Sequence, residues 1–345
     1  MSWTVTSLRI SLLAAVLALS ANAFAAEGAY TPQPAGAAPS TLREIRFTYH
    51  ADIPVQNRSA HKVEAWVPLP REDAFQRISD LKIESPAYVR IVAQPRFHNR
   101  VAYVAAEAPL AASIPVTVSF VVTRAEEAPS MIVAARPLPE PTGGAFADYL
   151  GPDRMVPLNG RIAAVSTNLE ESGATPLEQA RVIYQYVTDV MKYDKSGKGW
   201  GRGDAIYACD VRRGNCTDFH SLFIALVRAR SIPARFTIGF PLGNAKAGTI
   251  PGYHCWAEFY SGGEWVPIDA SEAWKHPERH DYYFGRLDAD RVAFTMGRDL
   301  VLDPPQHGQP VNFLVYPYVE VDGAAMPQGE IKTKFEYDDI RDVRK

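Results

Sequence analysis

Apolar and polar residues alternate along the first part of the chain that has a clear pattern. Ile45, Phe47 and Tyr49 alternate with more polar neighbours, and the same alternation returns at 116–122. A period of two is typical of strands that bury one face. We therefore predict several antiparallel strands in residues 42–135, arranged as a small β-sandwich.

A proline-rich passage at 136–160 interrupts the alternation, and we interpret it as a linker between two domains. Beyond this passage, apolar residues recur with the spacing of an α-helix. The clearest helix is predicted over 176–191, because Thr175 can cap it and Glu178 completes a capping box. We place the second domain at 161–290 and expect it to open with helices.

A second helix is predicted to begin beside Cys216 and to end before Pro233, because apolar residues recur between them at helical spacing. Short strands are expected after it, at 234–240, 254–260 and 265–270. The sequence Ser-Gly-Gly-Glu separates the last two strands, which predicts a β-hairpin. The tail 291–345 holds further strand-like pieces, which we expect to form a C-terminal β extension of this core.

The first 25 residues have a pattern of their own. They contain Arg9, an apolar run from Ile10 to Leu19 and then small residues, which is typical of a secretory signal peptide. No later stretch reaches the ~20 apolar residues that a transmembrane helix needs. Residues 26–41 are rich in proline, alanine and glycine and predict a flexible lead-in. We expect a periplasmic or secreted protein without membrane insertion after signal cleavage.

Composition and charge narrow the class of protein. The formal net charge is −3 at pH 7, and neither sign of charge forms a long block. Nucleic acid and acidic membranes are therefore not expected as partners. The sequence GKGWGRGD lacks the motifs that bind nucleotides. HPERH, at 276–280, offers no third ligand for a metal ion, so we expect neither a metal nor a cofactor.

Cys216 is the strongest candidate for a reactive residue. At the first turn of a helix, unpaired N–H groups and the helix dipole favour a thiolate. A nucleophilic cysteine also needs a base and a group that orients the base. His254 begins one predicted strand and Asp269 lies near the end of the next, so a hairpin would bring them to the same end. We expect the helix to lie across the strand face of His254, with the face of Cys255 as core.

Each of these residues also has a simpler interpretation. Cys216 could be a buried thiol, His254 a hydrogen-bonded strand residue and Asp269 an acceptor at a strand end. Their joint placement favours a reactive site. His220 competes with His254 as the base, but a partner on the same helix is poorly aimed at the sulfur. Asp218 is expected to interact with the helix dipole.

The three cysteines of the chain are too few for a disulfide scaffold, and no C-x-x-C spacing occurs. Export would still permit one disulfide. A bond between Cys209 and Cys255 would leave Cys216 free, and we keep this pairing as a hypothesis.

Three separated segments resemble the transglutaminase-like superfamily, in the form found in exported bacterial proteins. They are GNCTDFHSLFIALVRARSIPARFTIGF, YHCWAEFY and WVPIDASEAW, and the match covers about residues 160–280. The resemblance implies an α+β fold class, with a papain-like core whose cysteine opens a helix packed on an antiparallel sheet. It also implies Cys216 as nucleophile, His254 as general base and acid, and Asp269 as the partner of the imidazole.

The chemistry implied by the resemblance is acyl transfer from an amide of a peptide or protein, through a thioester on Cys216. Hydrolysis is favoured over cross-linking, because nothing in the sequence identifies a site for an amine acceptor. The Cys216 N–H is a candidate oxyanion donor, and the Trp200 indole is a candidate for the second. No acidic loop of EF-hand type occurs, so calcium dependence is not expected. The alternative function is a periplasmic peptide-binding or scaffold module without turnover.

Overall fold

The computed structural model describes residues 42–55, 59–129, 144–169 and 175–342. The signal peptide expected at 1–25, the lead-in expected at 26–41 and the first part of the expected linker lie outside these residues. None of the helices within the described ranges is long and apolar enough to cross a membrane.

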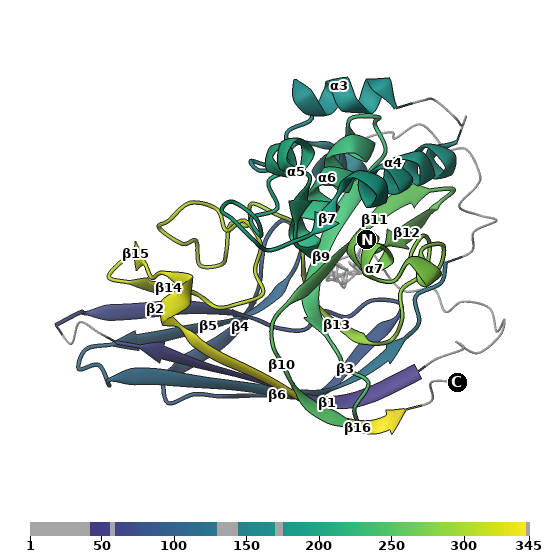
Figure 1. The fold of residues 1–345 in the computed structure, drawn as a ribbon. Helices are drawn as coiled ribbons and strands as arrows, with labels where there is room; N and C mark the ends of the chain where they lie inside the picture. Colours follow the sequence, from purple (N-terminus) through teal and green to yellow (C-terminus); the bar gives the residue numbers. More distant parts are fainter. Residues whose placement is uncertain (1–41, 56–58, 130–143, 170–174, 343–345) are drawn as a thin grey trace, which may run out of the picture. The chain divides into compact units, whose positions relative to one another are not determined.

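Two five-stranded antiparallel sheets form the β-rich part of the described residues (Figure 1). The first sheet has the strand order β10 (Ala247–Ile250), β16 (Lys332–Asp342), β1 (Leu42–Pro54), β6 (Ser113–Ala125) and β3 (Gln76–Glu84). The second sheet has the order β15 (Ala324–Ala325), β14 (Tyr318–Val321), β2 (Lys62–Pro68), β5 (Arg100–Glu107) and β4 (Tyr88–Ala93). The predicted alternation is confirmed in β1, where every second residue from Arg43 to Ile53 is buried.

A four-stranded antiparallel sheet, the core sheet, carries the rest of the strands that matter for the candidate site. Its order is β12 (Glu264–Ile268), β11 (His254–Ser261), β9 (Ala234–Pro241) and β13 (Arg291–Met296). The helix α6 (Cys216–Arg228) lies against β11 and β9, and every one of its residues is buried. Around α6 lie α3 (Arg161–Asn168), α4 (Pro176–Val190), α5 (Ala205–Val211) and α7 (Ala270–Lys275).

Shorter elements connect these parts. They are η1 (Gly144–Phe146), α2 (Ala147–Leu150), β7 (Lys192–Tyr193), β8 (Arg213–Gly214), η2 (Pro277–Arg279) and η3 (Gln328–Glu330).

Aromatic side chains join the first sheet to the core sheet. Phe47 of β1 lies 5.5 Å from Phe240 of β9 and 5.6 Å from Phe294 of β13, measured between ring centroids. Phe240 and Phe294 also contact each other edge to face at 4.9 Å. Burying these rings together contributes both hydrophobic and aromatic stabilisation. The core sheet therefore lies between α6 and the first sheet (Figure 1).

The two predicted helices and the predicted hairpin are confirmed. Thr175 and Glu178 form the expected capping box at the start of α4, and α6 begins at Cys216. The hairpin of β11 and β12 turns at Gly262 and Gly263, with φ values of 63° and 97°. A tight two-residue hairpin turn with positive φ at both positions is readily adopted by a glycine pair.

The tail differs from the expected extension of the core. Of residues 291–345, only β13 joins the core sheet, whereas β14 pairs with β2 and β16 pairs with β1. The apolar face of β16 explains why this strand pairs with β1. Phe335 of β16 packs on Tyr49 of β1, with 4.7 Å between ring centroids. The stretch before β14 forms little strand, because four prolines between 304 and 317 cannot donate to a ladder.

Gln76 links the first sheet to the core sheet through the main chain of a single residue, Ala293. Its side-chain Nε2 donates to the Ala293 carbonyl and to the Arg71 carbonyl, both at 2.8 Å, and its Oε1 accepts from the Ala293 N–H at 2.8 Å. Gln76 is fully buried. Ala293 lies where the ladder between β13 and β9 shifts register, so the glutamine satisfies groups that the ladder leaves free.

Replacing Gln76 with alanine should therefore leave the buried Ala293 N–H without a partner and remove one of the two hydrogen bonds that the Ala293 carbonyl accepts. We expect the Gln76→Ala substitution to lower the free energy of unfolding by about 1–3 kcal/mol, measured by urea denaturation. Gln185→Ala, on the exposed face of α4, is the control and should change stability by less than about 0.5 kcal/mol. Equal stability of the two variants would contradict the structural role of Gln76.

Candidate active site

Cys216 opens α6, and a capping box holds the start of this helix. Asn215 Oδ1 accepts a hydrogen bond from the Thr217 N–H at 3.0 Å. Asp218 Oδ2 accepts one from the Asn215 N–H at 3.0 Å, and the Asn215 amide donates to the Tyr253 hydroxyl at 2.9 Å. Cys216 is thereby fixed at the positive end of the helix dipole.

Asp218 does more than interact with the helix dipole. Its buried carboxylate also accepts from the N–H groups of Gly201, at 2.7 Å, and Gly203, at 3.1 Å. Burial raises the pKa of Asp218 above its usual value, although these N–H groups and that of Asn215 oppose the shift. The glycine-rich loop at 195–204 is thereby tied to the start of α6.

A glycine is required directly before this helix. Gly214 has a φ of 155°, and a Cβ at this position would lie 2.1 Å from Asp218 Oδ2. A side chain there would displace the carboxylate that holds the loop.

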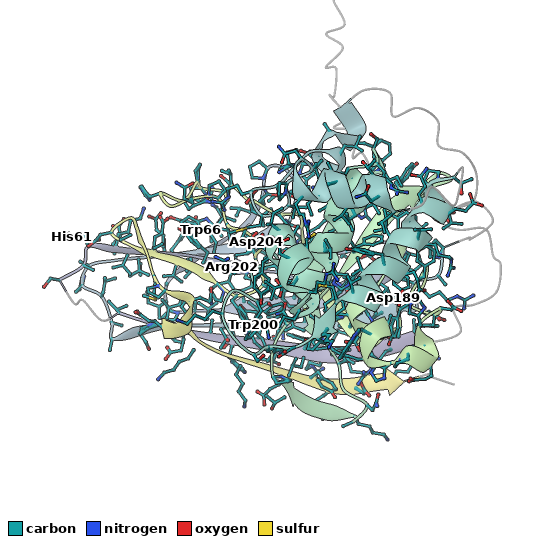
Figure 2. The ribbon with its side chains drawn as sticks, turned by 45° about the horizontal axis from the view of Figure 1, so that its top comes forward. His61, Trp66, Asp189, Trp200, Arg202 and Asp204 are labelled. Atoms are coloured by element: carbon teal, nitrogen blue, oxygen red, sulfur yellow. The ribbon has the colours of Figure 1, made fainter. Side chains whose placement is uncertain are left out.

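Arg298 also holds the glycine-rich loop, on which Figure 2 labels Trp200, Arg202 and Asp204. The Arg298 guanidinium donates to the carbonyls of Gly203 and Arg202, at 2.8 and 3.0 Å. Trp200 lies half-buried on the loop, with the Lys195 ammonium 6.0 Å from its ring centroid. The role of the Trp200 indole as second oxyanion donor stays a prediction.

His254 and Asp269 meet at one end of the β11–β12 hairpin. Ala257 pairs with Ile268, so His254, three residues earlier, and Asp269, one residue later, lie at the same end. His254 Nε2 lies 2.6 Å from Asp269 Oδ2, and both side chains are buried. The spacing of the two strands predicts this contact.

Asp269 also begins a helix that the sequence pattern did not reveal to us. We expected a strand over 265–270, but β12 ends at Ile268 and α7 follows Asp269 directly. Asp269 caps α7 through Oδ1, which accepts from the Glu272 N–H and the Ser271 hydroxyl, both at 3.0 Å. The sequence Asp-Ala-Ser-Glu is a capping signal that could have indicated this helix.

Cationic neighbours keep the buried Asp269 ionised. Arg291 of β13 donates from Nη1 to Asp269 Oδ2 at 3.0 Å. Burial raises the pKa of Asp269, but the positive charges of His254 and Arg291 outweigh it and hold this pKa well below its usual value. Burial lowers the pKa of His254, whereas Asp269 and Cys216 raise it to about 10. His254 is therefore an imidazolium at neutral pH.

The same imidazolium contacts Cys216. Cys216 is 1% exposed, and this burial raises the pKa of its thiol. Hydrogen bonds with Cys255 and His254, together with the charge of His254, outweigh burial and hold the pKa well below its usual value. Because Nε2 of His254 faces Asp269, Nδ1 is the nitrogen left to face the sulfur. Thiolate, imidazolium and carboxylate thus follow one another at neutral pH.

The helix lies on the other face of β11 from the one we expected. Phe223 of α6 contacts Phe259 at 6.1 Å between ring centroids, so α6 packs on the face that also carries Cys255. Glu258, on the opposite face, is buried as well and pairs with Arg235. His254 reaches Cys216 because it is the first residue of the strand and lies at its end. Since both faces of β11 are buried, alternation alone could not show which face holds the helix.

His220 and Cys255 lie directly behind Cys216. His220 Nε2 lies 3.2 Å from the Ala270 nitrogen and 3.5 Å from Asp269 Oδ1. His220 Nδ1 lies 3.6 Å from Cys255 Sγ. Cys255 in turn donates its S–H to the Cys216 sulfur. Burial raises the pKa of Cys255, and this hydrogen bond raises it further and lowers the pKa of Cys216.

The arrangement bears on two alternatives that the sequence left open. His220 faces Cys255, whereas His254 contacts Cys216, and the role of His254 as the base stays a prediction. The hypothesis of a disulfide between Cys209 and Cys255 is wrong, because all three cysteines are free.

The histidines of HPERH have ordinary structural partners. His280 Nε2 lies 3.1 Å from the Thr188 hydroxyl, and its ring packs on Tyr184 at 4.9 Å. Within the described residues, no three His, Cys, Asp or Glu side chains gather in a way that could hold a metal ion.

The contact with His254 predicts how Cys216 reacts with iodoacetamide. At pH 6 we expect rapid alkylation, because the lowered pKa keeps the thiolate populated below the usual range of a thiol. His254→Ala removes the hydrogen bond and the charge of His254, both of which lower this pKa, so that burial, which raises it, is opposed less strongly. The rate at pH 6 should then fall about tenfold or more, since each pKa unit is a factor of ten. Mass spectrometry locates the label, and an unchanged rate would contradict the contact.

The S–H group of Cys255 should have a separate, smaller effect. Cys255→Ala removes one hydrogen bond to the thiolate, so we expect the pH profile of Cys216 alkylation to move upward and the rate at pH 6 to fall about three- to tenfold. Cys255→Ser keeps a donor and should retain most of the rate. Cys209→Ala, in α5, is the control and should behave as the unchanged protein. A serine variant as slow as the alanine variant would contradict the role of the donor.

Comparisons with known proteins agree with this geometry. Residues 163–270 match the family described as the transglutaminase-like superfamily. An uncharacterized protein of Haemophilus influenzae is 29% identical over 330 residues, which cover 85% of this chain and 89% of that protein. An uncharacterized protein of Mycobacterium leprae is 29% identical over 130 residues, 35% of this chain and 44% of that protein.

Among solved structures, a protein of Cytophaga hutchinsonii proposed to be a cysteine protease has the same fold. It is 16% identical, with a TM-score of 0.60, over 87% of this chain and 93% of that one. The predicted fold class, an α+β chain with antiparallel sheets and a papain/transglutaminase-like core, is confirmed. This chain therefore carries a domain of the transglutaminase-like superfamily at residues 163–270.

Proposed function

We propose that this protein is a cysteine enzyme that transfers the acyl group of a peptide or protein amide through Cys216. The observation that carries the proposal is the buried contact of Cys216, His254 and Asp269 at the start of α6. The order of charge in this contact, thiolate, imidazolium and carboxylate, is the one that thiol-based acyl transfer requires.

The reaction then has two halves. The Cys216 thiolate attacks the amide carbonyl, and the resulting tetrahedral oxyanion collapses to a thioester when the C–N bond breaks. His254 gives its Nδ1 proton to the leaving amine. In the second half, His254 takes a proton from water, the hydroxide adds to the thioester, and the acid leaves as the C–S bond breaks and the thiolate returns.

Asp269 keeps His254 in the orientation that this proton transfer needs. It holds Nε2, so that Nδ1 stays directed at the sulfur. Arg291 shares the same carboxylate oxygen and balances its charge, which limits how strongly Asp269 retains the imidazolium proton. A proton held too firmly would slow the transfer to the leaving amine.

The Cys216 N–H is our candidate for the first donor to the oxyanion. The cap at Asn215 uses the Thr217 N–H, and none of the described residues accepts from the Cys216 N–H. The N–H therefore points outward at the positive end of the helix, where a developing negative charge is stabilised. The Trp200 indole stays our candidate for the second donor.

We favour hydrolysis over cross-linking because water needs no binding site of its own. The neighbour from Cytophaga hutchinsonii, proposed to be a cysteine protease, agrees with hydrolysis of peptide bonds. The N-terminal pattern of a signal peptide supports action in the periplasm or outside the cell. The alternative, a peptide-binding or scaffold module without turnover, is supported by one observation, the near-complete burial of Cys216.

A product search separates these possibilities. The protein is incubated with a periplasmic extract, and the peptides are analysed by mass spectrometry. Hydrolysis predicts new amino termini or deamidated glutamines, and cross-linking predicts new isopeptide bonds. We expect the first, with product formation about 10³-fold lower or less in Cys216→Ala.

Two outcomes would contradict the proposal. Products that form at the same rate with Cys216→Ala, or no product with either protein, would leave the binding module as the better assignment.

A further inference from the structure

The strand β10 is the edge of the first sheet, and it leads directly into the candidate active site (Figure 1). Among the described strands only β16 pairs with it. The chain then runs through Pro251 and Gly252 to Tyr253 and His254. An extended chain covers at most about 3.3–3.6 Å per residue, so Thr249 and His254, five positions apart, are separated by at most roughly 17 Å.

The register of β10 shows which of its main-chain groups are unused. The Asp339 N–H donates to the Lys246 carbonyl, and the ladder continues from this pair. In an antiparallel ladder, residues bonded to the partner alternate with residues whose groups point away. Gly248 therefore bonds to β16, whereas Ala247 and Thr249 direct their N–H and C=O groups to the open side. Both of these residues are exposed.

A pocket of about 320 Å³ adjoins the end of β10. Its apolar surface comes from Ile250, Ile331, Tyr316 and Phe335, and its polar surface from Thr249, Gln328, Thr333 and Lys334. The Lys334 ammonium is paired with Glu336 at 2.8 Å, so the pocket offers no free cation from this residue. Such a mixed lining suits a side chain that carries both polar and apolar atoms.

Contacting residues connect the pocket to Cys216. Tyr316 in the pocket packs edge to face on Tyr253, with 5.9 Å between ring centroids. Tyr253 accepts the hydrogen bond from Asn215, which precedes Cys216 in the chain. A series of contacting residues, Tyr316, Tyr253 and Asn215, therefore links the pocket at the end of β10 to Cys216.

We propose that the open edge of β10 docks the substrate, which adds to the first sheet as an extended strand. Its main chain bonds to the N–H and C=O groups of Ala247 and Thr249, and one of its side chains enters the pocket at Tyr316. An alternating row of donors and acceptors is best matched by another extended backbone, which makes an unfolded peptide segment the fitting occupant. This inference rests on the proposed function and names its substrate class.

Such docking depends on the main chain of the substrate more than on its sequence. The enzyme would accept many unfolded segments, with selectivity at the one position whose side chain enters the pocket. Folded helices would be excluded, because their N–H and C=O groups are already used.

Two variants of Thr249 test the docking. Thr249→Pro removes the outward N–H but leaves the ladder to β16 intact, because this N–H does not bond to β16. Thr249→Ala keeps the N–H and is the matched control. The probes are mixed-sequence peptides of one to six residues with a thiol-reactive group, a chloromethyl ketone at the carboxyl end or an iodoacetyl group at the amino end.

We expect labelling of Cys216 to accelerate with peptide length up to about five residues in at least one series. Both variants lose the Thr249 hydroxyl, so the comparison isolates the N–H group. Relative to Thr249→Ala, Thr249→Pro should reduce this acceleration about five- to tenfold, as expected for a lost hydrogen bond. Iodoacetamide, which has no peptide, should label all three proteins equally. On the unchanged protein, N-methylation of alternate peptide amides should give the same loss without any substitution.

Labelling that does not depend on peptide length, or that is equal in both Thr249 variants and with methylated peptides, overturns the docking. Dimerisation that Thr249→Pro abolishes, together with labelling that ignores peptide length, would assign the edge to a second copy of the chain instead. Failure of the proposed function is distinct, because it appears as slow iodoacetamide labelling that does not depend on His254.

Discussion

The pairing of one buried carboxylate with one buried imidazole is the interaction on which the site depends. Burial by itself disfavours both charges, and each is stable only because the other is present. Asp269 raises the pKa of His254, and the resulting cation lowers the pKa of Cys216. Arg291 completes the balance from β13. Removing either partner of the pair would leave the charge of the other less compensated in a dry interior, so the geometry of the site and the reactivity of Cys216 depend on the same pairing.

The fold supplies this pairing from segments that lie far apart in the sequence. Two residues that cap helices also organise the site. Asn215 caps α6 and positions Cys216, and Asp269 caps α7 and holds His254. The tail contributes two buried guanidinium groups. Arg291 holds the carboxylate, and Arg298 holds the glycine-rich loop against the start of α6. The same tail completes both N-terminal sheets through β14 and β16, which explains why the sheets and the core are joined so closely.

Local sequence signals predicted those parts of the fold that are locally determined. The cap at Thr175, the helical spacing after Cys216 and the Gly262–Gly263 turn each act within a few residues, and each element formed as expected. The meeting of His254 and Asp269 followed from the hairpin. The sequence did not show which face of β11 carries α6, because both faces are buried. The sequence also did not show that β16 pairs with β1, since many antiparallel partners fit the same alternation of apolar and polar residues. Cys255 was expected in the core and His220 was considered as a competing base, and only the hydrogen bonds reveal their place behind Cys216.

The protonation state of His254 is the most direct test of the central claim. Nitrogen-15 NMR of the histidine rings at pH 8 distinguishes an imidazolium from a neutral imidazole, and Cys216→Ala and His254→Ala assign the signal. With a pKa of about 10, His254 should still carry protons on both nitrogens at this pH. A neutral His254 ring at pH 8, with one unprotonated nitrogen and a titration near the ordinary histidine value, would contradict the charged series of Cys216, His254 and Asp269.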